Sequence, residues 1–217
     1  SHQLRTPISS MLWNLELLST KSDELTAAQH EYITKVERGV RKMNALVNEF
    51  LDATKLEMGT FATKEASFAL NAFLHNITQE YDALVAQKSL QLEVEGLVDE
   101  IQIYTDEHLL HMIVSNLISN AVKYTPEKGK VTVRVEHIGP HIQFTVRDTG
   151  IGVPLEDQSS LFKKLYRASN TKTSDTEGTG LGLYVVKEAV DILGGEISFT
   201  SVPMQGTEFV ETVPYRN

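Results

Sequence analysis

The first third of the chain carries apolar residues at helical spacing. Most of those over residues 4–18 recur three or four positions apart and therefore line one face of a helix. A polar stretch over residues 19–26 interrupts this pattern and supplies capping residues. The next pattern forms a heptad seam made of Ile33, Val36, Val40, Met43, Val47 and Phe50. The pattern predicts two helices, the second covering about residues 26–57 and ending near Gly59.

A single hairpin of these helices would leave much of both apolar stripes in water. Pairing two copies of the chain into a four-helix bundle buries them, so the sequence predicts a homodimer through the hairpin. The alternative is that the stripes pack against the rest of the same chain. On the wheel of the first helix, His2 lies well away from the apolar arc, and Thr6 shares its side one turn later.

From about residue 68 the period changes, and strands alternate with helices. Strands are predicted over residues 68–70, 90–95, 101–105, 131–136, 142–147, 197–200 and 208–213. Helices are predicted from an Asn71 cap to about Gln87, over residues 107–123, and over residues 181–193. The expected fold class is α+β, with a helical hairpin over residues 1–66 and an α/β sandwich over residues 67–217 that is long enough for its own core.

Composition and charge narrow the possible functions. The chain has no Cys, which excludes disulfides, thiolate metal sites and cysteine nucleophiles. No apolar run approaches the roughly 18–20 residues that span a bilayer. The net charge of −9 argues against nucleic acid as a partner. Residues 123–172 nevertheless carry nine basic and five acidic side chains, which suits a small polyanion but also fits an ordinary mixed surface.

Three polar segments of the second part could carry chemistry. Asn116, Asn120 and Lys123 share one helix face and can present a metal-binding oxygen, an amide and a cation. Asp148 ends a strand in "DTGIGVP", where glycines permit close backbone approach and a buried carboxylate could accept from an exocyclic amine. The segment "LFKKLYR" adds an aromatic and arginine patch. Each segment alone also fits an ordinary surface, turn or packing interpretation.

The run "EGTGLGL" places three glycines, Gly178, Gly180 and Gly182, at the start of a helix. Backbone N–H groups at such a start form an anion site. The run lacks the Gly-Lys-Ser/Thr ending of a P-loop and does not follow a strand as a dinucleotide-binding loop does. The polar stretch between Ala168 and Gly178 predicts a mobile lid over this site.

Taken in order, "SHQLRTP", "NLISNAVKYTP", "DTGIGVP", "LFKKLYR" and "GTGLGL" resemble the transmitter core of bacterial sensor histidine kinases. The resemblance covers essentially the whole chain. It implies a dimerising phosphoacceptor hairpin followed by an ATP-binding domain of the Bergerat type, shared with gyrase, Hsp90 and MutL. It also implies that His2 is phosphorylated from ATP, and that the phosphoryl group passes to an aspartate of a response-regulator receiver domain. The catalytic part is then expected to be cytoplasmic, with the sensor and any membrane anchor upstream of Ser1.

The resemblance assigns Asn116 to Mg²⁺, Asp148 to the adenine amino group, and the three glycines to the phosphates. The full set that it implies for ATP is Asn116, Asn120, Lys123, Tyr124, Asp148, Gly150, Gly152, Phe162, Tyr166, Arg167, Gly178, Thr179, Gly180, Leu181 and Gly182.

One position departs from the family pattern. Gln3 stands where the family usually has Glu or Asp, and an amide cannot take a proton at neutral pH. Thr6 matches the position that orients water when the family dephosphorylates its regulators. Three alternatives therefore accompany the kinase interpretation: a protein that acts chiefly as a phosphatase, a nucleotide-binding dimeric scaffold with decayed catalysis, and a gyrase-like or chaperone-like ATPase. A His-bearing hairpin has no role in the last.

Overall fold

The structure of this chain is a computed structural model. It describes residues 2–20, 25–96, 101–172 and 178–215, and at positions 2–5, 19 and 172 it describes the backbone only. The chain divides into two compact units, Ser1–Lys55 and Leu56–Asn217, and each is described by itself. The domain boundary expected from the sequence, between residues 66 and 67, lies further along the chain and stays a prediction.

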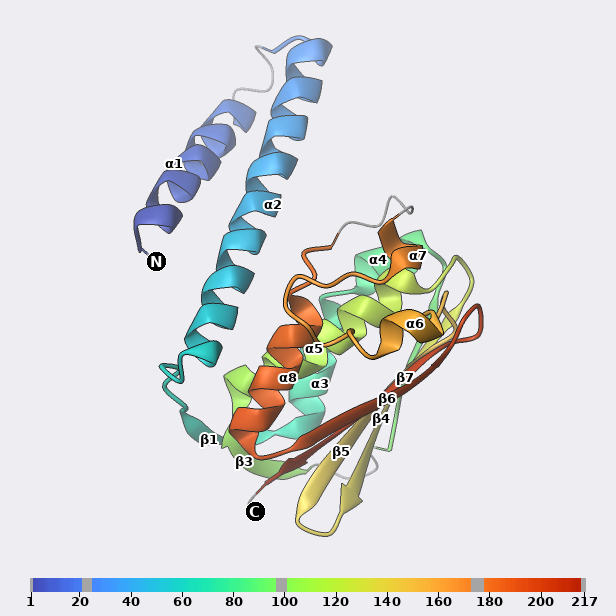
Figure 1. Cartoon of the computed structure of the whole chain (residues 1–217). Coiled ribbons are helices and arrows are strands. Elements are labelled where there is room, and N and C mark those ends of the chain that lie inside the picture. The colour runs from blue at the N-terminus through green and yellow to red at the C-terminus, as the bar shows by residue number, and fades with distance from the viewer. Residues whose placement is uncertain (1, 21–24, 97–100, 173–177, 216–217) are drawn as a thin grey trace. The chain divides into compact units, whose positions relative to one another are not determined.

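The first unit contains two helices, α1 (His2–Ser19) and α2 (Ala27–Glu57), of which α2 continues past the division. Figure 1 draws them as a hairpin. Thr26 begins α2 with a capping box: its Oγ1 accepts from the Gln29 backbone N–H (3.3 Å), and Gln29 Oε1 accepts from the Thr26 N–H (2.8 Å). Both helices predicted from the apolar pattern are therefore present.

Only part of the predicted seam is buried inside this hairpin. Ile8 and Leu15 of α1 pack with Val40 of α2 in one small core, against which Leu12, Ile33 and Val47 also lie. The alternate seam residues Val36, Met43 and Phe50 are 53%, 49% and 48% exposed. The hairpin thus buries one half of the seam and leaves a second apolar stripe open.

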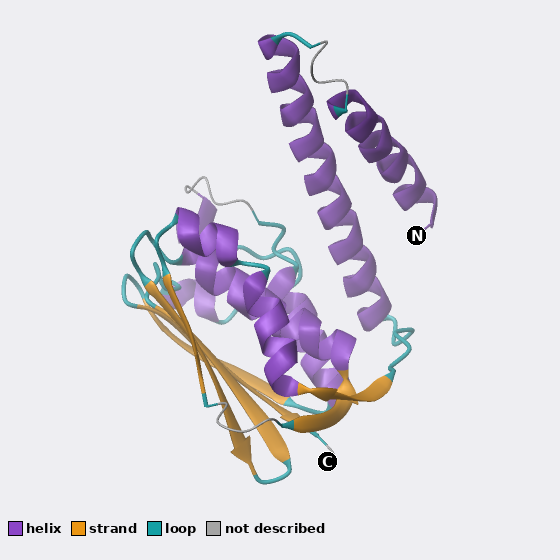
Figure 2. Ribbon diagram, turned by 180° about the vertical axis from the view of Figure 1, so that it is seen from behind, coloured by secondary structure: helices purple, strands orange, loops and turns teal. Residues whose placement is uncertain are grey.

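The second unit is a layered α/β structure. Its elements are β1 (Glu65–Ala69), α3 (Leu70–Gln79), α4 (Asp82–Gln87), β2 (Gln91–Glu95), β3 (Gln102–Asp106), α5 (Glu107–Tyr124), β4 (Lys130–Ile138), β5 (His141–Asp148), α6 (Leu155–Gln158), α7 (Ser169–Lys172), α8 (Gly182–Leu193), β6 (Glu196–Val202) and β7 (Gly206–Pro214). Five strands form a mixed sheet in the order β2-β4-β5-β7-β6, in which only β2 and β4 are parallel. Strands β1 and β3 form a separate antiparallel pair. The helices of this unit cover one face of the larger sheet (Figure 2).

The core lies between the sheet and α5 and α8. Strand β5 contributes Ile142, Phe144 and Val146 on one face, in the alternation expected of a half-buried strand. Strand β7 alternates in the same way, but one of its fully buried positions is Glu211. A carboxyl therefore lies in an otherwise apolar layer.

Helix α5 begins and α8 ends at well-defined caps. Asp106 Oδ1 accepts from the Leu109 N–H (2.9 Å) at the start of α5. Gly194 ends α8 in the left-handed region, where its N–H donates to Asp191 O (3.1 Å) and the Gly195 N–H donates to Val190 O (3.0 Å). This is the Schellman pattern, in which glycine avoids the cost of a Cβ at positive φ. The two caps fix the start of α5, which carries Asn116, Asn120, Lys123 and Tyr124 of the predicted site, and the end of α8, which begins at Gly182.

The region after β1 differs from its prediction. One helix from an Asn71 cap to Gln87 was expected, but the structure has α3 and α4, and the N-cap of α3 is Ala69. Asn71 lies inside α3, where its Oδ1 accepts from the Ile101 N–H (3.3 Å). The helix is interrupted before Tyr81, whose hydroxyl reaches α5 and donates to Ser115 O (2.9 Å). A tertiary contact has overridden the local helical pattern.

Candidate functional site

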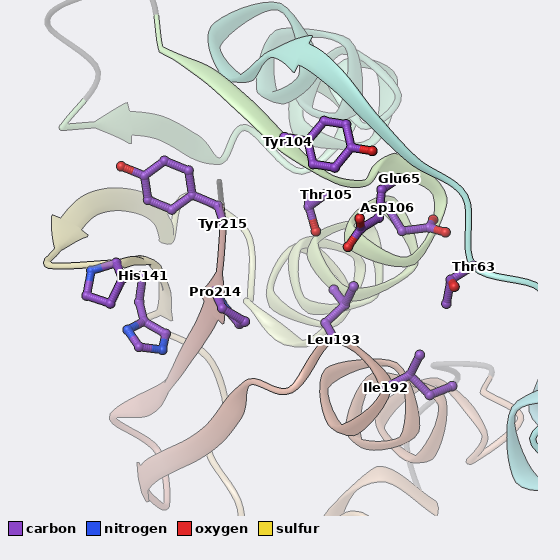
Figure 3. A pocket seen from close by; sticks show the side chains of 11 residues that line it. Thr63, Glu65, Tyr104, Thr105, Asp106, His141, Ile192, Leu193, Pro214 and Tyr215 are labelled. Atoms are coloured by element: carbon purple, nitrogen blue, oxygen red, sulfur yellow. The ribbon is translucent and has the colours of Figure 1, made fainter. Parts of the chain in front are cut away.

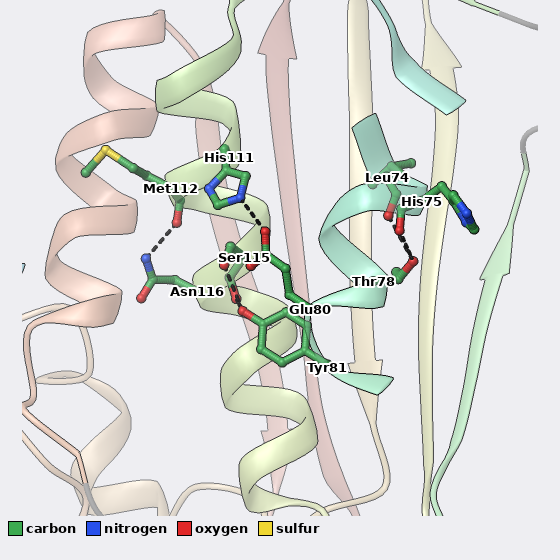
Figure 4. Close-up of polar contacts among 9 residues, drawn as sticks. All are labelled: Leu74, His75, Thr78, Glu80, Tyr81, His111, Met112, Ser115 and Asn116. Carbon is green, nitrogen blue, oxygen red and sulfur yellow. Dashed lines mark hydrogen bonds and ion pairs between the residues drawn. The ribbon is translucent and has the colours of Figure 1, made fainter. Parts of the chain in front are cut away.

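Asn116, in the carboxyl-terminal half of α5, points its side-chain carbonyl oxygen toward the first residue of α8. Asn116 Nδ2 donates to Met112 O one turn earlier (2.7 Å), which fixes the orientation of its amide (Figure 4). A Cβ added at Gly182 would lie 2.7 Å from Asn116 Oδ1. Glycine therefore allows α8 to begin directly against this oxygen, which is a suitable ligand for a hard cation.

Two cations and a phenol meet at the backbone of Gly178. A Cβ added there would lie 2.8 Å from Lys123 Nζ, 3.4 Å from Tyr124 Oη and 3.8 Å from Arg167 Nε. Burial raises the pKa of the Tyr124 phenol, and the positive charge of Arg167 opposes this rise. The phenol therefore stays protonated at neutral pH and can donate a hydrogen bond. This arrangement favours an anion beside the glycine backbone.

The glycine run over residues 178–182 packs closely against the backbone of Leu165 and Tyr166. Gly180 has φ of +74°, and a Cβ there would lie 2.7 Å from the Tyr166 carbonyl oxygen. The Leu181 N–H donates to Thr179 Oγ1 (3.0 Å), and the Leu181 side chain is buried. Helix α8 then begins at Gly182, so its first N–H groups and the positive end of its dipole lie beside Asn116.

Asp148 combines burial with one open oxygen. Its Oδ1 accepts from the N–H groups of Gly150 (2.7 Å) and Thr207 (3.2 Å). Within the described part of the chain, Oδ2 accepts no hydrogen bond, and it is not among the fully buried atoms. Burial raises the pKa of Asp148 to about 6, and the two N–H donors oppose the rise. At neutral pH the group is therefore largely a carboxylate with one acceptor oxygen available to a ligand.

The loop after Asp148 is attached to α5 and to the segment before the lid. The Ile151 N–H donates to Tyr124 O (3.2 Å), and a Cβ at Gly150 would lie 2.7 Å from that same oxygen. Gly152 has φ of +62°, and its carbonyl accepts from Asn170 Nδ2 (2.8 Å). Asp148 and the end of α5 therefore belong to one connected structure.

We call residues 165–171 the lid stem. Asp157, which is buried, accepts from Tyr166 Oη (2.5 Å) and from the Ser169 N–H and Oγ (both 2.7 Å). Arg167 Nη2 donates to Thr171 O (2.8 Å). The mobile lid was predicted for the stretch between Ala168 and Gly178. Its first part forms α7 (Ser169–Lys172), and residues 173–177 fall outside the described residues.

The structure thus brings together many of the predicted site residues. Asn116, Lys123, Tyr124, Arg167 and the three glycines converge, and Asp148 joins them through its loop. Asn120 lies half-buried on α5 between these groups.

Three predicted positions have other surroundings. Phe162 packs against the rings of Phe199 and Phe209 at 5.7 and 6.4 Å, and Tyr166 anchors the lid stem. Their roles toward a nucleotide stay predictions. Thr6 is exposed on α1.

The position predicted to accept the phosphoryl group, and its neighbour, are described only in part. His2 and Gln3 lie in the first turn of α1, and their side chains fall outside the described residues.

Sequence reasoning missed Asp157 and Asn170, which hold the lid stem. Asp157 lies within the stretch that leads into "LFKKLYR", but no periodic pattern marks a buried carboxylate there. A cavity of about 360 Å³ lies at the other end of α8 (Figure 3), lined by Ile192, Leu193, Asp106, Tyr104 and others. No predicted site residue lines it.

Comparison with known proteins agrees with this geometry. Residues 1–59 match the His Kinase A (phospho-acceptor) domain, and residues 105–217 match the Histidine kinase-, DNA gyrase B-, and HSP90-like ATPase family. The chain belongs to the sensor histidine kinases. The signal transduction histidine-protein kinase BarA of Escherichia coli K12 is 34% identical over 215 residues, covering 96% of this chain and 23% of the relative. The circadian input-output histidine kinase CikA of Synechococcus elongatus is 33% identical over 219 residues, covering 99% and 29%.

A crystal structure of full-length ShkA in complex with AMPPNP superimposes with a TM-score of 0.85 at 27% identity, covering all of this chain and 44% of that chain. The chain spans about a quarter of the length of the curated histidine kinases it matches. Among the described helices, none is both long enough and apolar enough to cross a membrane.

The residues present fit the ATP and Mg²⁺ that this family implies. A Cβ would come within 2.8 Å of Lys123 Nζ at Gly178 and within 2.7 Å of Asn116 Oδ1 at Gly182, so the missing side chains let a cation and an amide oxygen approach the glycine backbone. The described residues contain no cluster of three His, Asp or Glu that could hold a metal. A magnesium ion held by Asn116 would therefore depend on phosphate oxygens and water, which is how Mg²⁺ is commonly bound.

Proposed function

We propose that this chain binds ATP with Mg²⁺, phosphorylates its own His2, and passes the phosphoryl group to an aspartate of a response-regulator receiver domain. The observation that carries the proposal is the convergence of Lys123, Tyr124 and Arg167 on the backbone of Gly178. A cationic, glycine-lined start of a helix is suited to an anionic ligand such as a polyphosphate.

Each part of the site has a separate task. Asp148 Oδ2 accepts from the exocyclic amine of adenine. Lys123, Arg167 and the glycine N–H groups hold and neutralise the phosphates, while Asn116 Oδ1 holds Mg²⁺. ATP supplies the phosphoryl group when bound. The chain's contribution is mostly positioning and charge neutralisation, which is what phosphoryl transfer requires.

His2 is the nucleophile in this proposal. A neutral imidazole nitrogen forms a bond to the terminal phosphorus, the bond from that phosphorus to the bridging oxygen of ADP breaks, and the imidazole proton leaves to solvent. Gln3 cannot collect that proton, since an amide has no basic site at neutral pH. We therefore expect slow autophosphorylation.

The open stripe of the hairpin supports a homodimer. Val36, Met43 and Phe50 alternate along α2 with the residues buried inside the hairpin. Burying such a stripe against a second copy completes a four-helix bundle. Met43→Glu should give monomers in light scattering because it would place a carboxylate in that interface. Val40→Glu is a poorer test, since Val40 belongs to the core within the hairpin.

A second candidate is that the chain acts chiefly as a phosphatase of its regulator. Gln3 and Thr6 favour it, because both side chains can bind water without taking a proton.

The test is incubation of the unmodified chain and of His2→Gln with γ-labelled ATP and Mg²⁺. Alkali-stable, acid-labile label on the unmodified chain alone supports histidine phosphorylation. Nucleotide binding without label would indicate a scaffold, and ATP hydrolysis without label would indicate a gyrase-like ATPase. Adding a phosphorylated receiver domain and measuring its loss of phosphate separates the phosphatase.

A further inference from the structure

We call the segment from Tyr81 to Lys88 the α4 brace. Its side chains donate hydrogen bonds to backbone carbonyls of α5 and to that of Thr125, the residue after α5. Lys88 is the residue that ends α4. Its Nζ donates to the carbonyl oxygens of Val122 (2.8 Å) and Lys123 (3.0 Å), and also to that of Thr125. One ammonium group therefore contacts three carbonyls at the end of α5.

These contacts supply hydrogen-bond donors to carbonyls at the carboxyl-terminal end of α5. The last four carbonyls of a helix have no partner within it. In α5, Ala121 O accepts from the Thr125 N–H (3.1 Å), and Tyr124 O accepts from the Ile151 N–H (3.2 Å). The two carbonyls between them, those of Val122 and Lys123, are the ones that Lys88 holds. Without Lys88 they would lack these donors.

The same end of α5 carries side chains of the candidate site. Lys123 and Tyr124 approach Gly178 from its last turn. The end of a helix has a partial negative charge of about half an electron, which opposes an anion nearby. The ammonium of Lys88 offsets that charge. Burial lowers the pKa of Lys88, as expected of an amine packed into the protein.

The other end of the brace contacts α5 one residue before Asn116. Tyr81 Oη donates to Ser115 O (2.9 Å) and lies 2.7 Å from Ser115 Oγ (Figure 4). Burial raises the pKa of the Tyr81 phenol, so the hydroxyl stays a donor. The brace thus holds α5 at both ends of the stretch that carries Asn116, Asn120, Lys123 and Tyr124.

We propose that Lys88 is a positioning residue of the nucleotide site: it holds the last turn of α5 so that Lys123 and Tyr124 face Gly178, and it offsets the partial negative charge of that helix end. The inference rests on the proposed ATP binding. None of the motifs that identify the family contains Lys88, which lies 35 residues from Lys123.

The test is calorimetric titration of the full chain with a non-hydrolysable ATP analogue and Mg²⁺, well below the unfolding temperature of every variant. Lys88→Met removes the donors and the charge at similar volume, and we expect the dissociation constant to rise about tenfold. Lys88→Arg restores both donors and charge and should bind within about threefold of the unmodified chain. The matched control is Lys130→Met: among the described residues the Lys130 side chain makes a surface ion pair with Glu93 (2.8 Å) and no other polar contact, so the variant should leave affinity unchanged.

Equal affinity of folded Lys88→Met and the unmodified chain would overturn the proposal, as would Lys88→Arg binding as weakly as Lys88→Met. If Lys88→Met does not fold, Lys88→Gln replaces it, since its amide can donate but has no charge. Unchanged affinity of Lys88→Gln would then refute the electrostatic role. If the unmodified chain fails to bind the analogue, the proposed function itself fails, which is a distinguishable result.

Discussion

Glu211 should make the stability of the second unit fall as pH rises. The residue is fully buried on the inward face of β7, and neither carboxyl oxygen has a hydrogen-bond partner among the described residues. Phe144 of β5 and Ile197 of β6 are its cross-strand neighbours. Burial raises its pKa from 4.5 to about 8, because the charged form is excluded from this apolar layer.

The size of the effect follows from the two pKa values. Between pH 4.5 and about pH 8 the unfolded chain releases the proton while the folded chain keeps it, so unfolding becomes easier with rising pH. Each pH unit in this window is worth about 1.36 kcal/mol. Glu211→Gln copies the protonated carboxyl without titrating. Relative to the unmodified chain, it should be more stable by about 1 kcal/mol at pH 5.5 and about 4 kcal/mol at pH 7.5.

The assay must report on the second unit alone. The chain has one tryptophan, Trp13, and it lies in the first unit, so its fluorescence is unsuitable. Hydrogen exchange of peptides from β5 and β7 gives the opening free energy of the relevant sheet at each pH. The control is Glu208→Gln, half-buried on the opposite face of β7, for which we expect little change. A difference between Glu211→Gln and the unmodified chain that does not grow with pH would refute this reasoning.

Predictions for four further variants concern the proposed activities. Asp148→Asn should weaken the binding of an ATP analogue by about 1–3 kcal/mol and the binding of GTP little. In calorimetry, the affinity of the unmodified chain for the ATP analogue should fall as the pH drops through about 6, because Asp148 then becomes protonated. Gly182→Ala places a methyl group 2.7 Å from Asn116 Oδ1, so affinity should fall more with Mg²⁺ than without it. Gln3→Glu should speed autophosphorylation and alter its pH profile, whereas Thr6→Ala should mainly slow dephosphorylation of the regulator. An unchanged rate and pH profile in Gln3→Glu would mean that position 3 has no acid–base role.

Periodic patterns in the sequence predicted most of the elements that form the site. The helix expected over residues 107–123 is α5 (Glu107–Tyr124), and the one expected over residues 181–193 is α8 (Gly182–Leu193). Both are amphipathic helices with local start or stop signals, so their neighbours along the chain are sufficient to specify them. Glycine spacing also indicated the backbone approaches of the proposed phosphate site, since only a missing Cβ permits those at Gly178 and Gly182.

Features that depend on long-range contacts could not be predicted in this way. The break between α3 and α4 lies at Tyr81, whose hydroxyl donates to Ser115 O, 34 residues away. Lys88 acts on a helix end 34 to 37 residues later, and nothing local distinguishes it from a surface lysine. Glu211 lies at an inward position of an alternating strand, but its residue type alone would assign it to solvent.

The hydrogen bond between the Ile151 N–H and Tyr124 O joins the adenine-binding and phosphate-binding parts of the proposed site to each other. The two ends of one ligand would then meet binding groups at a fixed separation. Once either end is held, the other reaches its groups at a high effective concentration, as in a chelate. Adenosine and inorganic triphosphate would each bind weakly, and the covalent link between them would supply much of the affinity for ATP.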